Sequence, residues 1–186
     1  MDDKEFLKRL KRGDPLAQKQ LYDTYAPKML GIAMRYASSR EEAEDILQEA
    51  FVKIFKNIDK FESRGSFEGW MIRILINTAI IKYHKEKKHR YQYDITEIKE
   101  TDIDNFDTTD PDFTMDEIMQ AIQSLPPGYR TVFNLYAIEG YKHKEIAQIL
   151  NIDVSTSKSQ YHRAKKLLQK KLIQLKNYRL KNNGKL

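Results

Sequence analysis

The chain has 186 residues, with 33 Lys and Arg against 27 Asp and Glu, a net charge of +6 and no cysteine. This length allows one domain or two small ones. The lack of cysteine excludes disulfides, thiolate catalysis and every zinc or iron–sulfur site with Cys ligands. Met1 leads into Asp2, Asp3 and Lys4 rather than an apolar segment, and the mean hydropathy is −0.71. We therefore expect a cytoplasmic protein without membrane insertion.

The charge falls into three blocks. Residues 1–90 carry 19 basic and 14 acidic side chains, and residues 118–186 carry 13 basic and three acidic ones. Between them, residues 91–117 hold ten acidic side chains and one basic one. Repulsion within this acidic block favours an extended or disordered segment. Because helical patterns fill both flanking blocks, we predict an all-α protein of two small helical domains, residues 1–90 and 118–186, joined by a flexible acidic linker, 91–117.

Helical signals run through the first block. Asp14 and Pro15 form an N-cap and first-position pair, and Pro27 is expected to open a further helix. Ser39 and Glu42 have the spacing of a capping box. The apolar residues that follow recur at helical spacing and predict a buried stripe. The stripe consists of Ala43, Ile46, Leu47, Ala50, Phe51, Ile54, Phe55 and Ile58.

The opposite face of this predicted helix is polar, with acidic residues first and lysines last. One interpretation is a solvated face whose charges suit the helix dipole. The other is a docking surface for a basic protein partner. The residues alone leave both open.

The next helix is predicted from Phe67 towards Lys88, capped by Ser66 after a turn at Gly65. Its second half interleaves cations with aromatic rings. This pattern suits single-stranded nucleic acid, because cations follow phosphates while rings stack on bases. The alternative is a solvated helix end whose cations complement the helix dipole.

The last block predicts a short helix from Met115 to Leu125, another from Tyr129 to Ile138, and then a helix-turn-helix. In that motif a short helix, 143–150, is followed by a turn at Asn151 and a longer helix from 154 to about 171. The longer helix has a polar face formed by Thr156, Ser159, Gln160 and Arg163. Such side chains can contact bases in the major groove. Plain helix packing with the same spacing is the alternative.

These segments resemble the extracytoplasmic-function class of bacterial RNA polymerase sigma factors, in order and over nearly the whole chain. Residues 42–51 (EAEDILQEAF) and 67–74 (FEGWMIRI) are similar to sigma region 2. Residues 125–133 (LPPGYRTVF), 139–147 (EGYKHKEIA) and 156–160 (TSKSQ) are similar to sigma region 4. The family often has Asp near Ile81 and Gly where Asn151 stands.

The resemblance implies three binding surfaces. Core polymerase, through the clamp helices of its largest subunit, would contact Asp45, Gln48, Glu49 and Val52. The promoter −10 element, melted and with a base flipped, would contact Phe61, Ser63, Arg64, Arg73, Asn77, Lys82, Tyr83 and Lys85. The −35 duplex would contact Arg130, Lys142, Thr156, Lys158, Ser159, Gln160 and Arg163, with Arg130 and Lys142 near backbone phosphates.

The resemblance also implies transcription initiation at a specialised set of promoters. The partners it implies are the polymerase, including its flap region, promoter DNA and an anti-sigma factor, with a monomer in the free state. It implies no cofactor or metal. An enzyme is disfavoured because no nucleophile–base pair, metal-ligand motif or phosphate-binding Gly loop is present. A two-domain repressor or activator predicts a ligand-binding or dimerising N-terminal domain, and an interaction module leaves the polar recognition face unexplained.

Overall fold

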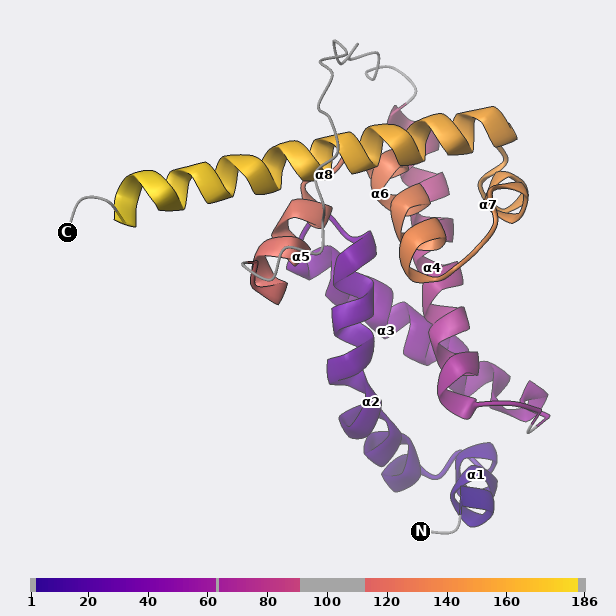
Figure 1. Ribbon diagram of the computed structural model, residues 1–186. Coiled ribbons are helices and arrows are strands. Elements are labelled where there is room, and N and C mark those ends of the chain that lie inside the picture. The colour runs from indigo at the N-terminus through magenta and orange to yellow at the C-terminus, as the bar shows by residue number, and fades with distance from the viewer. Residues whose placement is uncertain (1–2, 63, 91–112, 184–186) are drawn as a thin grey trace. The chain divides into compact units, whose positions relative to one another are not determined.

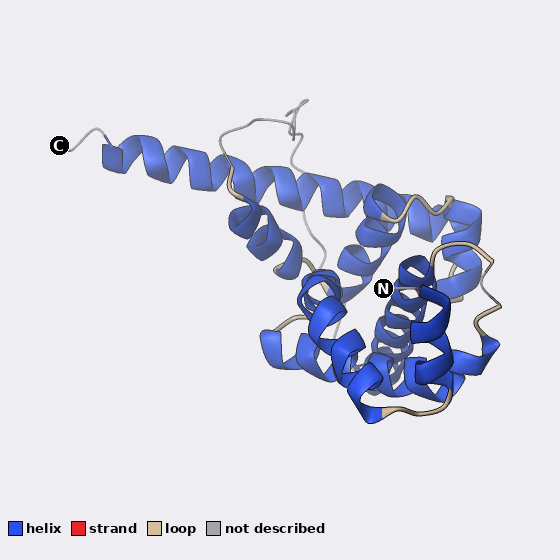
Figure 2. Ribbon diagram, turned by 90° about the horizontal axis from the view of Figure 1, so that it is seen from below, coloured by secondary structure: helices blue, strands red, loops and turns tan. Residues whose placement is uncertain are grey.

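The computed structural model describes residues 3–62, 64–90 and 113–183. Every regular element in these ranges is helical, which confirms the predicted all-α class (Figure 2). The chain divides into two compact units, Met1–Glu86 and Lys87–Leu186. Most of the predicted linker, residues 91–112, lies outside the described residues. No helix in the described ranges is long and apolar enough to cross a bilayer.

The first unit is built on helix α3. It contains α1 (Asp3–Lys11), α2 (Pro15–Tyr36), α3 (Arg40–Asn57), a 3-10 turn η1 (Ile58–Lys60) and α4 (Phe67–Arg90). The helices α2 and α3 pack along each other, and α1 packs against α2 (Figure 1). The predicted apolar stripe of α3 and η1 is buried, except that Phe55 is half-buried. Burial of each large apolar side chain contributes about 1.5–3 kcal/mol.

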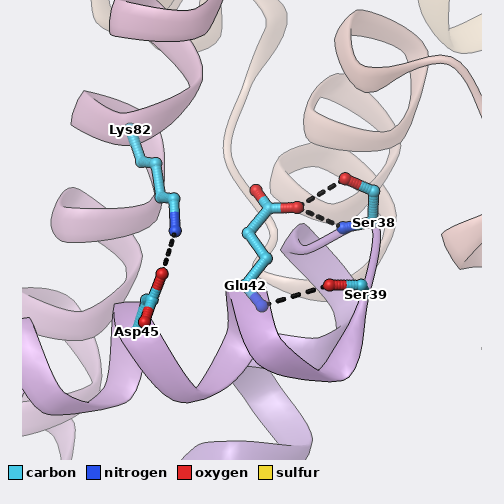
Figure 3. A network of polar contacts seen from close by, with 5 residues as sticks. All are labelled: Ser38, Ser39, Glu42, Asp45 and Lys82. Atoms are coloured by element: carbon cyan, nitrogen blue, oxygen red, sulfur yellow. Dashed lines mark hydrogen bonds and ion pairs between the residues drawn. The ribbon is translucent and has the colours of Figure 1, made fainter.

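Two predicted caps begin these helices. Asp14 Oδ1 accepts hydrogen bonds from the backbone N–H groups of Leu16 (2.9 Å) and Ala17 (3.3 Å). Ser39 Oγ accepts from the Glu42 N–H at 3.2 Å. The Glu42 carboxylate does not return to Ser39 but accepts from the N–H of Ser38 at 2.7 Å (Figure 3). Both caps thus satisfy backbone donors that a first helical turn leaves unpaired.

The prediction that Pro27 opens a further helix is wrong, because α2 runs through it without interruption. A proline inside a helix removes one backbone hydrogen bond and costs about 3 kcal/mol. Buried apolar residues lie on both sides of Pro27, including Leu21, Ala26, Met29 and Ile32. Their shared packing against the core offsets the cost and keeps one helix.

The second unit contains α5 (Met115–Gln123), α6 (Pro127–Phe133), a π-helical turn η2 (Asn134–Ile138), α7 (His143–Leu150) and α8 (Val154–Asn183). The helices α5, α6 and α7 all pack against α8 (Figure 1). Asn151 ends α7 in the left-handed conformation, with φ 49° and ψ 56°. This confirms the predicted helix-turn-helix and the role of Asn151 in its turn.

The segment predicted as one helix from Tyr129 to Ile138 differs in the structure. It starts earlier, at Pro127, and changes to a π-helical turn after Phe133. Within that turn the Glu139 N–H donates to the Asn134 carbonyl at 3.0 Å. Tyr136 in this turn is 38% exposed. The wider turn places the Tyr136 ring at the start of α7, where it stacks on the ring of His143.

A separate apolar cluster holds α5 against the middle of α8. Its buried members are Ala121, Ile122, Leu125, Ala164, Leu168 and Leu172. Beyond it, the Arg179 guanidinium donates to Glu117 Oε1 and lies 6.0 Å from the centre of the Phe113 ring. Contacts along α8 therefore continue well past the helix-turn-helix.

Candidate nucleic-acid interface

An open groove runs between α3 and α4 on the first unit. It is lined by Asp45, Gln48, Glu49, Val52, Lys82 and Lys85. Lys82 Nζ from α4 lies 3.3 Å from Asp45 Oδ2 of α3, as Figure 3 shows. The groove thus joins all four residues expected to bind polymerase to two lysines expected to bind DNA.

Glu49 is surrounded by the charges of three lysines. Its carboxylate pairs with Lys53 at 2.8 Å. The Lys53 hydrogen bond, followed by the charges of Lys85 and Lys82, holds the pKa of Glu49 below its ordinary value. The carboxylate is therefore ionised at neutral pH and available to a basic partner.

Two exposed aliphatic side chains lie among the charged side chains of these helices. Val52 of α3 is 49% exposed and Ile81 of α4 is 44% exposed. Ile81 stands where the family often has Asp. Both side chains therefore add apolar area to the exposed surfaces of α3 and α4.

The residues of α4 expected at the −10 element are accessible to different degrees. Arg73, Asn77 and Lys85 are exposed, whereas Lys82 and Tyr83 are half-buried. The Tyr83 ring lies 5.6 Å from the ring of His84. The same helix buries Met71, Leu75, Ile76, Ala79 and Ile80. One face of α4 therefore anchors the helix while another presents polar groups.

The loop before α4 divides into a buried and an exposed part. Phe61 is buried, with its ring centre 4.9 Å from that of Phe67 and 5.5 Å from that of Trp70. Arg64 is exposed and pairs with Glu62 at 3.4 Å. Ser63 lies outside the described residues. In this arrangement Phe61 supports the loop from inside, and Arg64 lies on its exposed side.

The start of α8 presents the polar face predicted from the sequence. Lys158, Ser159 and Arg163 are exposed, and Thr156 and Gln160 are half-buried. Lys142, in the preceding turn, is also exposed. Arg163 Nη1 donates to the Tyr129 hydroxyl at 3.3 Å, while the side chain remains exposed.

Arg130 occupies a different environment from the other expected −35 contacts. It is 3% exposed, and its Nη1 donates to the Gln123 carbonyl at 2.6 Å. This interior position differs from the surface position that the resemblance implied. The guanidinium links the end of α5 to α6, so its role in the structure is to hold these helices together.

Sequence reasoning missed a polar cluster between α7 and α8. His143 Nδ1 lies 2.9 Å from Ser157 Oγ, and the His143 ring stacks on Tyr136 with centres 4.2 Å apart. Tyr161 lies edge-on to His143 at 5.9 Å. The only sequence signal was a serine on the apolar face of α8, since its partner is 14 residues away. Among the described residues, no three His, Asp or Glu side chains are grouped to hold a metal ion.

Comparison with known families decides which class of protein carries these surfaces. The model of Sigma-70 region 2 matches residues 21–89, and that of Sigma-70, region 4 matches residues 115–168. The ECF RNA polymerase sigma factor SigW of Bacillus subtilis is 34% identical over 183 residues, covering 92% of this chain and 97% of the relative. The chain belongs to the ECF family of RNA polymerase sigma factors. A sigma factor directs promoter recognition and the initiation of transcription.

Other relatives of this sigma factor agree with the assignment. The RNA polymerase sigma-H factor of Pseudomonas aeruginosa is 33% identical over 183 residues, covering 91% of this chain and 93% of the relative. Among solved structures, the sigma factor RpoE from Bartonella quintana, in complex with the anti-sigma factor NepR, matches with a TM-score of 0.50. That match has 23% identity and covers 83% of this chain and 95% of the other. It supports the fold.

Proposed function

We propose that this sigma factor directs polymerase to a specialised set of promoters by reading the −35 duplex with α8 and the melted −10 strand with α4. The observation that carries the proposal is the exposed polar row at the start of α8. Lys158, Ser159 and Arg163 project from the second helix of a helix-turn-helix. In such motifs the first residues of that helix contact base edges.

The groove between α3 and α4 is the proposed docking site for core polymerase. Asp45 and Glu49 supply negative charge, while Gln48 and Val52 supply a hydrogen-bonding and an apolar contact. A partner helix with arginines and one aliphatic residue would complement this groove. The flap region of the polymerase is the proposed second contact, through region 4.

The −10 element is assigned to α4 and the loop before it. Arg73 and Asn77 lie one helical turn apart on the exposed side of α4, so they can follow successive phosphates of one strand. Tyr83, Lys82 and Lys85 continue the surface, and Arg64 extends it into the loop. The proposed domain boundaries remain residues 1–90 for region 2, 91–117 for the linker and 118–186 for region 4.

The proposed setting is the cytoplasm, with an anti-sigma factor as the regulator. The sigma factor from Bartonella quintana is bound to such a partner, and its match to this chain supports the fold. We also propose that the free protein is a monomer and acts without chemistry of its own, since its relatives are transcription initiation factors.

Transcription with purified core polymerase and genomic templates tests this function. Adding the protein should create defined new start sites that core polymerase alone does not use. Mapping these starts also yields the promoter sequences needed for binding measurements. If the protein binds core polymerase and no new starts arise, the proposed function is wrong.

Replacing Arg163 with Ala tests the −35 assignment. The holoenzyme should bind its promoter about tenfold more weakly, because one base or phosphate contact of this kind contributes about 1–3 kcal/mol. Binding to core polymerase, measured by competition with labelled wild-type protein, should not change. An equal loss of polymerase binding would show that Arg163 supports the fold.

A further inference from the structure

The contact between His143 and Ser157 joins the two helices of the helix-turn-helix through a buried polar group. Ser157 lies on α8 and is 0% exposed. His143 is the first residue of α7, and its Nδ1 lies 2.9 Å from Ser157 Oγ. A buried hydroxyl without a partner costs about 1–3 kcal/mol. The pair is therefore a specific polar link between α7 and α8.

Aromatic rings fix the His143 side chain on its other faces. Tyr136 of the π-helical turn stacks on the imidazole at 4.2 Å with an angle of 12° between the rings. Tyr161 of α8 meets the imidazole at 5.9 Å and Tyr136 at 4.5 Å. Three side chains from two segments, η2 and α8, thus contact one imidazole, which leaves His143 little rotational freedom.

The polar cluster lies directly behind the exposed recognition residues. Ser157 is flanked in sequence by Thr156 and Lys158, and Tyr161 follows Gln160. A shift of Ser157 or Tyr161 therefore moves the side chains proposed to meet the −35 duplex. Positioning errors of about 1 Å are enough to weaken recognition of this kind.

We propose that His143 is a positioning residue for −35 recognition, holding α8 in its reading orientation through Ser157, Tyr136 and Tyr161 and releasing it in acid. The inference rests on the proposed function, because it takes α8 as the −35 reader. In the tautomer that carries its proton on Nε2, the neutral imidazole accepts the Ser157 hydroxyl at Nδ1. Protonation turns Nδ1 into a donor, so the Ser157 hydroxyl must rotate to accept, and a positive charge is placed beside a buried group and Lys158.

The surroundings of His143 favour its neutral form. Burial lowers the pKa of His143 below its ordinary value, and the positive charge of Lys158 is a second, smaller cause. Burial together with Tyr136 raises the pKa of Tyr161, so the Tyr161 hydroxyl stays protonated at neutral and acidic pH. The charged residues next to it in sequence are Lys142, Lys144 and Glu145, and the Glu145 carboxylate accepts from the Lys142 N–H at 2.7 Å.

The test measures binding of reconstituted holoenzyme to a labelled promoter duplex taken from the mapped start sites, between pH 5.5 and 7.5. At pH 7.5, His143→Ala should weaken binding by about threefold to tenfold, the range of one net hydrogen bond. His143→Gln keeps a polar group beside Ser157 and should bind within about twofold of wild type. Acidification should weaken wild type by a similar factor and leave H143Q unaffected.

Two further variants keep the result interpretable. His162 is exposed on α8, so His162→Gln should follow the wild-type pH profile and controls for effects of acid on the polymerase. Ser157→Ala should weaken binding, and the H143A S157A double variant should lose no more than the weaker-binding single variant. An H143Q profile that follows wild type, or H143A binding that equals wild type, would overturn the inference.

Unfolding of the free full-length chain separates this inference from the proposed function. Between the lowered pKa of folded His143 and its ordinary value in the unfolded chain, the unfolded state binds more protons, so stability falls as pH falls. H143Q should reduce that dependence whether or not the protein binds promoters. A holoenzyme that binds no duplex at any pH would refute the proposed function, and an unchanged unfolding profile would refute the inference.

Discussion

The burial of Arg130 changes the expected result of replacing it. Its guanidinium donates to the Gln123 carbonyl at 2.6 Å from a position 3% exposed. Arg130→Met should therefore lower the free energy of unfolding by about 2–3 kcal/mol, since a buried charged hydrogen bond is lost and a carbonyl loses its partner. Chemical denaturation of the full-length chain measures this change.

Lys142 provides the matched control for Arg130. It is exposed, so Lys142→Gln should change the unfolding free energy by less than about 0.5 kcal/mol. If R130M is as stable as wild type while promoter binding is lost, Arg130 contacts DNA as the resemblance implied, and the interior role is wrong.

The pairing of α3 with α4 links the two proposed surfaces of the first unit. Lys82 contacts Asp45 at 3.3 Å, so binding of polymerase at Asp45, as proposed, would release Lys82 for DNA. Asp45→Asn should therefore weaken binding to core polymerase. It should also raise the affinity of the free chain for a labelled single-stranded oligonucleotide by about twofold to threefold, the scale of an exposed ion pair.

Glu44 is the control for Asp45, because it pairs with Arg40 of the same helix at 2.9 Å rather than with α4. Glu44→Gln removes the same charge from α3. It should leave oligonucleotide affinity closer to wild type than Asp45→Asn does. Equal gains in the two variants would mean that only net charge matters.

The attachment of α5 to the distal part of α8 depends on an ionised carboxylate. Hydrogen bonds from Thr114, followed by Arg179, hold the pKa of Glu117 below its ordinary value. For a carboxyl with a lowered pKa, the stabilisation is present above its unfolded pKa and is lost as pH falls through the folded one. Glu117→Gln should lower the thermal midpoint by a few degrees at pH 7, and the difference should vanish in strong acid. A difference that persists there would exclude the ion pair as its cause.

The whole chain carries its positive charge mainly in the last 69 residues, which hold 13 basic side chains and three acidic ones. Promoter affinity of the holoenzyme should therefore fall steeply with salt. Each phosphate contact adds about −0.9 to the slope of log K against log salt concentration. Lys142→Gln should make that slope shallower by about one contact. A slope identical to wild type would remove Lys142 from the phosphate contacts.

Local patterns in the sequence predicted those parts of the fold that local interactions determine. The spacing from Ala43 to Ile58 identified the buried face of α3, because helical periodicity alone decides which side chains share a face. Asn151 was identified as a turn residue because few other residues tolerate positive φ. The three charge blocks predicted the division into two units, and the family resemblance supplied the candidate binding residues.

Features that depend on distant contacts escaped prediction. Pro27 suggests a helix start in sequence, but packing of the residues around it keeps α2 continuous. Arg130 resembles a surface cation until its buried partner, seven residues earlier, is known. The link from His143 to Ser157 requires the turn between α7 and α8 to bring the two together. Neither composition nor periodicity contains that information.

The length of α8 has a mechanical consequence. Figure 1 shows it as one straight rod, running without interruption from Val154 to Asn183. From Thr156 to Arg179 the axis extends about 35 Å at the usual rise per residue. A tilt of about 6° applied at Arg179 displaces the other end by about 3.4 Å, the spacing of one base pair. The helix therefore acts as a lever. A partner bound to its distal end would shift the promoter contacts by about one base pair without touching DNA.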